Sequence, residues 1–314
     1  MNKCTGCGVK IETNDLCERC FRIKHYNDYK LVSKNNNEFY EILDKVKTTN
    51  DLVVLVVDLF NLDRNLEDLT KRLNNNILLV LSKRDILPKK LYDQKLLDYF
   101  DNFNIKFIDK IIISSKKNYN FDLLYEKINN YKTSNNVYVI GYTNSGKSTM
   151  INKLIYNYTD LKQEITTSIL PSTTLDTLEI KLNENLTIID TPGILPEDNL
   201  INMVEGNILR KIIPQIEIKP ETYQIKSKQI FIIDELLRVE AARDIIFYLS
   251  DKLEIKRYYK ENDKLLNLEK HIIKAIRNED IVISGLGFIK ILQNTEIIIY
   301  TIPNVSVYKR KSLI

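Results

Sequence analysis

The feature that most constrains this chain is a glycine loop near its middle. Residues 141–148 have the sequence Gly-Tyr-Thr-Asn-Ser-Gly-Lys-Ser, which fits the phosphate-binding pattern G-x-x-x-x-G-K-[ST]. The segment 137–140 before it has the composition of a buried strand, and the segment 149–155 after it has helical character. A chance match in a glycine turn is the alternative, but only 8 glycines occur in 314 residues and both flanks fit. The loop therefore predicts a nucleotide site.

The residue types in this loop suit the chemistry of a bound nucleotide. Glycine lets the backbone curl so that N–H groups point at phosphate oxygens, and the helix that follows adds its positive end. Lys147 is expected to reach the β- and γ-phosphates, and Ser148 is expected to hold Mg²⁺. The other residues expected to contact the nucleotide here are Gly141, Asn144, Ser145, Gly146 and Thr149.

Unbroken apolar runs alternate with helical patterns on both sides of the loop, which is typical of parallel strands covered on both faces. Such strands are expected at 52–57, 77–81, 111–113, 137–140 and 186–189, with a half-exposed strand at 177–182. Helices are expected at 38–46, 65–73, 92–100 and 121–131. Strands that alternate with helices predict an α/β sheet with right-handed crossovers.

Two short segments resemble the elements that read guanine. Ser82-Lys83-Arg84-Asp85 is similar to N-K-x-D, in which the aspartate accepts hydrogen bonds from the guanine N1–H and exocyclic amine. Such charge-assisted bonds contribute about 1.5–3 kcal/mol each. Lys83 is expected to lay its stem along the base, and Ser82 replaces the usual asparagine. Ser114-Ser115-Lys116 resembles S-A-K, where the Ser115 N–H would meet guanine O6. The alternative for 82–85 is an acidic turn after a strand.

A fourth motif follows the last buried run. Asp190-Thr191-Pro192-Gly193 fits D-x-x-G at the end of a strand. Asp190 is expected to hold Mg²⁺ through water, and the Gly193 N–H is expected to sense the γ-phosphate. This short pattern is weak by itself and gains weight because a phosphate loop precedes it.

All four cysteines lie within the first twenty residues, as two C-x₂-C pairs. Two such pairs aim four thiolates at one tetrahedral centre, which predicts a structural zinc ion and a reducing setting. Two redox pairs or unused thiols are the alternatives. The following segment 21–30 interleaves basic and aromatic side chains, as an RNA contact or a solvated face would. The expected zinc ligands are Cys4, Cys7, Cys17 and Cys20.

The order of these motifs carries a family resemblance. Most GTPases begin with the phosphate loop, whereas here the guanine-reading segments at 82–85 and 114–116 precede it and D-x-x-G comes last. With the four-cysteine segment in front and Ser-Gly-Leu-Gly-Phe at 284–288, the chain resembles the circularly permuted GTPases of the YqeH type. Permutation preserves a sheet when the old termini lie close together, because contacts depend on space and not on chain order.

The resemblance implies the parts of a switch. Residues 171–174 correspond to the family pattern P-G-T-T, so Thr174 is implied to bind Mg²⁺ and sense the γ-phosphate, with Thr173 as the fallback. Ile194 stands where Ras-like enzymes carry a water-orienting glutamine, which predicts slow hydrolysis. The family also implies that Asn144 helps to hold K⁺, with a loop-shaping role as the alternative. The implied catalytic set is Asn144, Lys147, Thr174 and Gly193.

The predicted fold class is α/β, with three domains. A zinc ribbon is expected at 1–36, a circularly permuted P-loop GTPase domain at 37–213, and a smaller α+β or β-rich domain at 214–314. In the last domain we expect a strand at 223–233, helices at 241–249 and 265–277, and three short strands within 281–302. Its basic-aromatic clusters at 256–260 and 308–311 indicate either RNA binding or exposed lysines.

Composition limits the functional classes. A hydrophobic content of 44% and a charged content of 28% are ordinary for a globular protein. The net charge of +4 permits a nucleic-acid partner without establishing one. No apolar run is long enough to span a bilayer and no leader is visible, which predicts a cytoplasmic protein without a membrane partner. An organelle reached by an unrecognised signal stays open.

The predicted function is Mg²⁺-dependent binding and hydrolysis of GTP to GDP. The resemblance implies a role in ribosome assembly, with the small subunit as the expected site and a ribosomal subunit or rRNA as partner. One alternative is a GTP-regulated RNA-binding or scaffold protein whose hydrolysis is incidental. Another is a metabolic phosphate-loop enzyme such as a nucleotide kinase. The sequence leaves the oligomeric state open.

Overall fold

The chain forms two compact units. The computed structural model describes residues 2–12, 15–18, 20–21, 36–62, 66–159, 176–194 and 196–314. One unit comprises residues 1–85 with 93–196, and the other comprises residues 86–92 with 197–314. No helix in the described parts is long and apolar enough to cross a membrane.

Some of the sequence predictions lie outside these ranges. The expected switch residues Thr173 and Thr174 are among them, and so is nearly all of the basic-aromatic segment 21–30. The bounds of the three predicted domains stay predictions, and residues 197–213 belong to the second unit.

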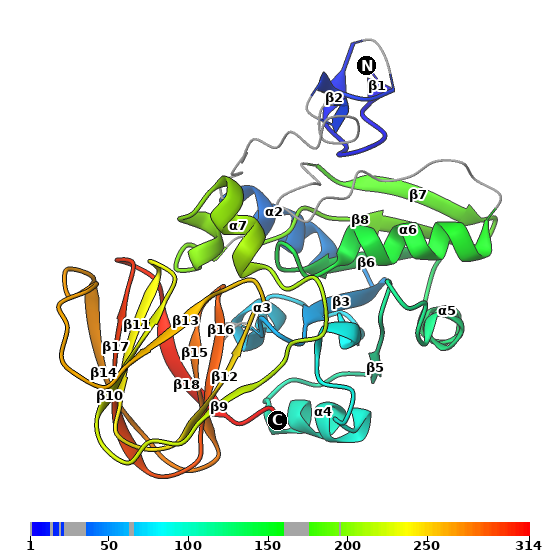
Figure 1. The fold of residues 1–314 in the computed structure, drawn as a ribbon. Helices are drawn as coiled ribbons and strands as arrows, with labels where there is room; N and C mark the ends of the chain where they lie inside the picture. The colour runs from blue at the N-terminus through cyan, green and yellow to red at the C-terminus, as the bar shows by residue number, and fades with distance from the viewer. Residues whose placement is uncertain are drawn as a thin grey trace. The chain divides into compact units, whose positions relative to one another are not determined.

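A six-stranded sheet forms the centre of the first unit (Figure 1). Every neighbouring pair in it is parallel except β7 with β8. The strands, in their order across the sheet, are β5 (Asp109–Ile112), β4 (Ile77–Ser82), β3 (Leu52–Asp58), β6 (Asn136–Gly141), β8 (Leu186–Asp190) and β7 (Leu178–Asn183). The predicted α/β sheet is therefore confirmed.

The burial of each strand follows from its composition. All seven residues of β3 and all six of β4 are buried, as expected for apolar runs covered on both faces. The edge strand β7 alternates between buried and exposed residues, as its sequence predicts. The helices are α2 (Asn36–Lys47), α3 (Leu66–Lys71), α4 (Asp93–Tyr99), α5 (Phe121–Tyr131) and α6 (Lys147–Tyr158). The helices predicted in this part of the chain are thus confirmed within a few residues.

The sheet brings together segments that are far apart in sequence. Strand β6, which leads into the phosphate loop, pairs with β3 on one side and β8 on the other. Strand β3 in turn pairs with β4, so that Asp58 lies beside Ser82. Loops at the carboxyl ends of neighbouring parallel strands share one edge of a sheet, where α/β proteins bind their ligands. All four nucleotide-binding motifs follow such strands.

The second unit contains two five-stranded antiparallel sheets (Figure 1). Their orders are β13-β10-β11-β17-β14 and β18-β15-β16-β12-β9. The strands are β9 (Glu221–Tyr223), β10 (Gln229–Ile233), β11 (Leu237–Ala241), β12 (Ile245–Leu249), β13 (Ile255–Tyr258), β14 (Glu269–Ala275), β15 (Glu279–Ile283), β16 (Gly287–Ile291), β17 (Thr295–Thr301) and β18 (Val307–Lys311). A short helix, α7 (Gly206–Ile212), precedes them.

Two helices predicted in this unit are wrong. Residues 241–249 contain the end of β11, a turn and β12, and residues 265–277 contain β14. Cross-strand pairing decides both cases, because β12 lies between β9 and β16 and β14 pairs along its whole length with β17. The strand predicted at 223–233 is two strands of different sheets. Residues 214–314, all of them described, form no helix, so the β-rich alternative is confirmed and the α+β alternative is wrong.

Candidate nucleotide-binding site

The phosphate loop has the predicted setting between a strand and a helix. Strand β6 ends at Gly141, and α6 begins at Lys147 after Gly146, whose φ of 92° lies in the left-handed region. Gly141 has no room for a side chain, because an added Cβ would lie 2.2 Å from the Val56 carbonyl oxygen of β3. The glycine pattern therefore reflects a close approach of the loop to the neighbouring strand.

Several polar atoms of this loop are buried without a hydrogen-bond partner in the described structure. They are Thr143 Oγ1, Asn144 Nδ2 and Ser145 Oγ. Asn144 also has a φ of 61°, a conformation that costs energy for residues other than glycine. Buried polar groups without partners are expensive, and they gather where a ligand supplies the missing contacts. The loop thus fits a polar, charged ligand such as a chain of phosphates.

Lys147 is folded back onto the loop that carries it. Its Nζ donates hydrogen bonds to the Gly141 and Tyr142 carbonyl oxygens, at 3.0 and 3.1 Å. Burial lowers the pKa of the Lys147 ammonium to about 8, although the nearby Asp190 carboxylate opposes the shift. Two neutral carbonyl oxygens compensate a buried ammonium less well than phosphate would, so the side chain is ready to exchange them for an anion.

The D-x-x-G segment is held against the phosphate loop. Asp190 ends β8 fully buried beside β6. The Thr143 N–H donates to the Ile194 carbonyl oxygen at 2.7 Å, and the Ile194 N–H donates to the Gly141 carbonyl oxygen at 3.3 Å. A Cβ on Gly193 would lie 2.8 Å from Thr143 Cα. The two phosphate-facing motifs therefore share one backbone framework.

Ser82 connects the guanine-reading segment to the phosphate loop. Its hydroxyl lies at the end of β4, buried, and donates to the Ser145 carbonyl oxygen at 2.5 Å, with the Val57 carbonyl oxygen 3.2 Å away. A serine in place of asparagine thus has a definite role here, since it bridges two loops that are 63 residues apart in sequence. The sequence alone did not indicate this bond.

The second guanine-reading segment, residues 114–116, joins the same network. Ser114 Oγ donates to the Asp85 carboxylate at 2.6 Å, and the Arg84 N–H donates to the Ile113 carbonyl oxygen at 3.1 Å. Ser115 is half-buried and Lys116 is exposed. The hydrogen bonds therefore bring together segments 82–85 and 114–116, as a single base-binding site requires.

Comparison with known proteins agrees with a GTPase site built from these motifs. The family model described as RsgA GTPase matches residues 41–198, and the model described as 50S ribosome-binding GTPase matches residues 136–284. The protein named YqeH from Bacillus subtilis (strain 168) is 32% identical over 99% of this chain and 99% of its own. This chain is a circularly permuted GTPase of the YqeH family.

Other relatives of this YqeH-family chain match about half of it. GTPase Der from Mycoplasma mycoides subsp. mycoides SC is 31% identical over 49% of this chain and 37% of Der. Genetic interactor of prohibitins 3, mitochondrial, from Saccharomyces cerevisiae (strain YJM789), is 29% identical over 48% of this chain and 27% of that protein. These matches support the GTPase fold and leave the role of the rest of the chain to be proposed.

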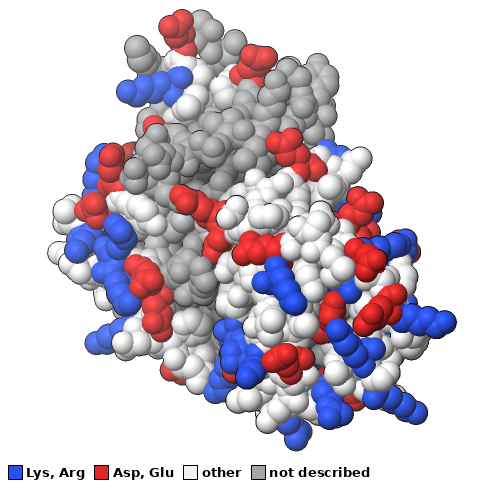
Figure 2. All heavy atoms as spheres, turned by 90° about the vertical axis from the view of Figure 1, so that its left-hand side faces the viewer, with Lys and Arg blue, Asp and Glu red and all other residues white. Residues whose placement is uncertain are grey.

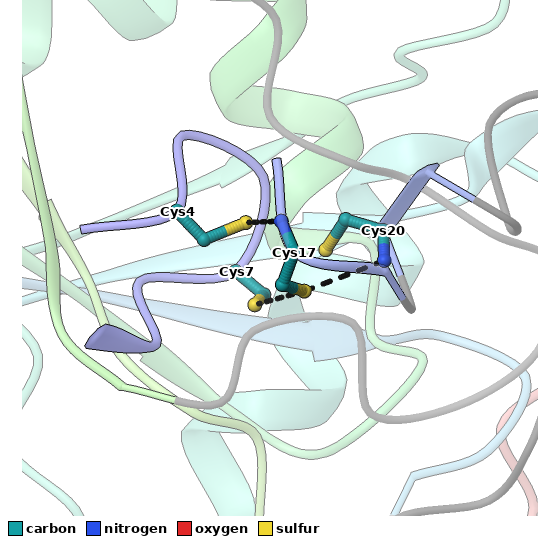
Figure 3. Close-up of side chains that lie close together, drawn as sticks. All are labelled: Cys4, Cys7, Cys17 and Cys20. Atoms are coloured by element: carbon teal, nitrogen blue, oxygen red, sulfur yellow. Dashed lines mark hydrogen bonds between the residues drawn. The ribbon is translucent and has the colours of Figure 1, made fainter. Parts of the chain in front are cut away.

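The four cysteines of this YqeH-family chain form one cluster (Figure 3). Their sulfur atoms all lie within 4.8 Å of one another, and Cys7 Sγ is 3.7 Å from Cys17 Sγ. A disulfide needs about 2.05 Å, whereas a tetrahedral zinc with Zn–S bonds of about 2.3 Å sets neighbouring sulfurs about 3.8 Å apart. The donor set therefore fits one metal ion that all four thiolates could hold.

Backbone groups support this cluster. The Cys17 N–H donates to Cys4 Sγ at 3.2 Å, and the Cys20 N–H donates to Cys17 Sγ at 3.4 Å (Figure 3). Hydrogen bonding with Cys20 lowers the pKa of the Cys7 thiol to about 5, against the opposing effect of burial. The Asp176 N–H donates to the Cys7 carbonyl oxygen, so the chain two residues before β7 is bonded to the cysteine cluster.

The basic clusters of the C-terminal domain are largely engaged within the domain. Arg257 donates to Gln229 and to the Gln224 carbonyl oxygen, and it stacks over Tyr259. Arg310 pairs with the buried Asp280. On the face in Figure 2, basic and acidic side chains alternate and do not gather by sign. Charge alone therefore does not single out an RNA-binding surface on that face.

One functional candidate was missed in the sequence. Asp58 ends the wholly buried strand β3, and Lys83 donates to its carboxylate at 2.9 Å. None of the four motifs described above includes this residue. Its sequence signal is a charged residue that directly follows six apolar ones, at the carboxyl end of a predicted parallel strand.

Proposed function

We propose that this chain binds GTP and hydrolyses it slowly, as a switch in ribosome assembly. The observation that best supports a single nucleotide site is the hydrogen bond from Ser82 to the Ser145 carbonyl oxygen, which links the segment expected to bind the base to the phosphate loop. In this site Asp85 would accept two hydrogen bonds from guanine, and adenine offers no such pair of donors. A nucleotide kinase would not need that aspartate.

The reaction divides among a few residues. Lys147 would leave the loop carbonyls for the β- and γ-phosphates, and the Gly193 N–H would contact the γ-phosphate. Ser148, Asp190 and Thr174 would hold Mg²⁺, which when bound neutralises charge that develops on the transferred phosphoryl group. Thr174 enters by the family resemblance, since it lies outside the described residues.

Slow turnover is part of the proposal. Ile194 occupies the place of the water-orienting glutamine, and its side chain is only 6% exposed. Its backbone N–H and C=O are both hydrogen-bonded to the phosphate loop, so the backbone that carries the side chain is held in place. An aliphatic side chain held in this way cannot orient an attacking water, and an activator on the partner would have to supply that function.

A potassium ion near Asn144 is the proposed substitute for an arginine finger. Asn144 belongs to the phosphate loop, and its amide oxygen would be the K⁺ ligand, while its buried Nδ2, which has no partner in the described structure, would donate to a phosphate oxygen. Steady-state turnover in K⁺ against Na⁺ at equal ionic strength tests this role. We expect faster hydrolysis in K⁺, and equal rates would leave Asn144 with a loop-shaping role only.

Zinc at the cysteine cluster is proposed to be structural. Four thiolates would fill every tetrahedral position, so no site for a substrate would remain. The segment around them is small, and a metal ion would supply folding energy that its apolar residues cannot. We expect the purified protein to contain about one equivalent of zinc. A variant that carries both Cys4→Ser and Cys7→Ser should lose this zinc.

The ribosomal role depends on the relatives. A family model that matches this chain is described as a 50S ribosome-binding GTPase, and the YqeH resemblance implies the small subunit. We propose the small subunit or its rRNA as partner, in the cytoplasm, and treat the large subunit as an outcome of the test. Since one relative is named as mitochondrial, an organelle would not contradict the proposal.

Sedimentation with purified subunits tests this proposal. The protein is centrifuged with small or large subunits in GDP, in a non-hydrolysable GTP analogue, or without nucleotide. We expect co-sedimentation with small subunits mainly in the GTP analogue. The Asp85→Asn variant is the control, because it should respond to the xanthosine analogue instead. If subunit binding were the same with every nucleotide, and if subunits did not raise the rate of GTP hydrolysis, the results would favour a scaffold protein with incidental hydrolysis.

A further inference from the structure

Asp58 is a buried carboxylate at the edge of the candidate nucleotide site, and it lies outside the four motifs described above. It is 5% exposed and lies at the carboxyl end of β3, between β4 and β6 in the sheet. Its Oδ1 accepts a hydrogen bond from the Phe60 N–H at 2.9 Å. Its Oδ2 accepts one from Lys83 Nζ at 2.9 Å and one from Asn61 Nδ2 at 3.3 Å.

Lys83 is held in an unusual way by this contact. Its φ of 60° places it in the left-handed region, which residues with a side chain seldom adopt. Its side chain is only 23% exposed, so the ammonium is paired with Asp58 in a partly water-excluded position. An ion pair of this kind holds its partners firmly, because an unpaired charge there would be costly.

The neighbours of Lys83 are the residues that define the base site. Ser82 precedes it and bonds to the phosphate loop, and Asp85 follows two residues later and accepts from Ser114. An ammonium held at Asp58 limits the rotamers that the aliphatic stem of Lys83 can adopt. A fixed stem presents an apolar surface for a base at little entropic cost, whereas a free lysine would lose rotamer freedom on binding.

We propose that Asp58 is a positioning residue for base recognition, which acts by holding Lys83. The proposal rests on the proposed GTP site. It assigns Asp58 to the affinity for the guanine base and leaves the phosphates to the glycine loop. A purely structural ion pair would instead affect folding and would not distinguish one part of the nucleotide from the other.

A double-mutant cycle separates these roles. The Asp58→Asn variant keeps an oxygen for the Phe60 N–H but turns an NH₂ group, which cannot accept a hydrogen bond, toward Lys83. The Lys83→Met variant keeps an apolar stem without the charge. We measure dissociation constants for GDP and for inorganic tripolyphosphate with the full chain, and the thermal midpoint without ligand.

The expected result is specific to the base. Asp58→Asn should weaken GDP binding about tenfold and change tripolyphosphate binding less than twofold. The double variant Asp58→Asn with Lys83→Met should bind GDP no more weakly than Lys83→Met alone, since Asp58 acts through Lys83. Equal losses for GDP and tripolyphosphate, or additive losses in the double variant, would overturn the proposal.

A second Lys83 variant and the base preference of the wild type provide two further tests. If Asp58→Asn does not fold, the Lys83→Arg variant can be used in its place, because arginine can keep an ion pair with Asp58. Lys83→Arg should retain GDP affinity within about threefold, whereas Lys83→Met should lose about tenfold. Equal loss in both would overturn the proposal. The wild-type preference for GDP over ADP is measured in parallel. If the wild type bound GDP and ADP equally well, the proposed GTP site itself would be wrong. Additive losses in the double variant would instead contradict only the role of Asp58.

Discussion

The base side and the phosphate side of the site differ in how their polar groups are satisfied. On the base side Ser82, Lys83 and Asp85 all have partners within the protein, at 2.5, 2.9 and 2.6 Å. On the phosphate side Thr143, Asn144 and Ser145 each have a buried polar atom without a partner in the described structure. A satisfied network is preorganised, whereas an unsatisfied one gains most from a charged ligand.

This difference suggests a division of work. If the base side selects the nucleotide with groups that are already in place, its substitutions should change which base binds. If the phosphate side supplies affinity and senses the number of phosphates, its substitutions should act on every nucleotide alike. Variants on each side test this division.

The largest effect is expected at Asp85. Asp85→Asn removes the acceptor for two guanine donors, each bond being worth about 1.5–3 kcal/mol, so GDP affinity should fall by about a hundredfold or more. Xanthosine diphosphate, which presents an acceptor in place of the amine, should bind better than GDP. Titration with both nucleotides measures the exchange. Asp68→Asn, at an exposed surface pair with Lys71, is the matched control. Loss of both nucleotides together would contradict the base-side assignment.

The next largest effect is expected from a steric clash when Gly193, on the phosphate side, is replaced by alanine. In Gly193→Ala the new Cβ would meet Thr143 Cα at 2.8 Å and Lys147 Nζ at 2.9 Å, so the D-x-x-G segment or the phosphate loop must shift. We expect GDP and tripolyphosphate to weaken together, by about tenfold or more, in calorimetric titrations.

The control for this collision is Gly206→Ala. Gly206 has a φ of 55° and no atom within 4 Å of the added Cβ, so the substitution strains the backbone without a clash. It should lower thermal stability slightly and leave nucleotide binding unchanged. If Gly193→Ala weakened GDP but spared tripolyphosphate, the comparison between the two sides would be wrong.

A smaller effect is expected at the bridge between the two sides. Ser82→Ala leaves the buried Ser145 carbonyl without its donor, and one hydrogen bond contributes about 0.5–1.5 kcal/mol, so nucleotide binding should weaken between about twofold and tenfold. Ser82→Asn restores the residue common in N-K-x-D and should bind like the wild type. An unchanged affinity in Ser82→Ala would show that the two sides act independently.

The parallel sheet could be predicted from the sequence because its strands are buried on both faces. Runs such as 52–57 and 77–81 have few structural alternatives, and the glycine loop fixes which strand precedes the first turn of α6. The C-terminal unit was harder to predict. Residues 265–277 carry apolar residues at helical spacing, yet β17 pairs with seven of them and sets their exposure to a period of two.

The bonds inside the site could not be predicted at all. Motifs gave Ser82, Asp85 and Ser114 as residue types, but the Ser82–Ser145 and Asp58–Lys83 contacts depend on β3 lying between β4 and β6. Strand order is a property of the folded chain, and in a permuted protein it does not follow the sequence. Asp58 was overlooked for the same reason.

The smallest effect concerns Lys147 and pH. Burial lowers the pKa of its ammonium to about 8 from 10.5, so between these values folding releases a proton and the free energy of unfolding of the ligand-free protein should rise with pH. Phosphate binding needs the charged form. GDP affinity should therefore fall about fourfold from pH 7 to 8.5, with proton uptake seen as a buffer-dependent heat. A flat profile would mean that Lys147 keeps its charge, and that the phosphate side is better satisfied than its unpaired atoms indicate.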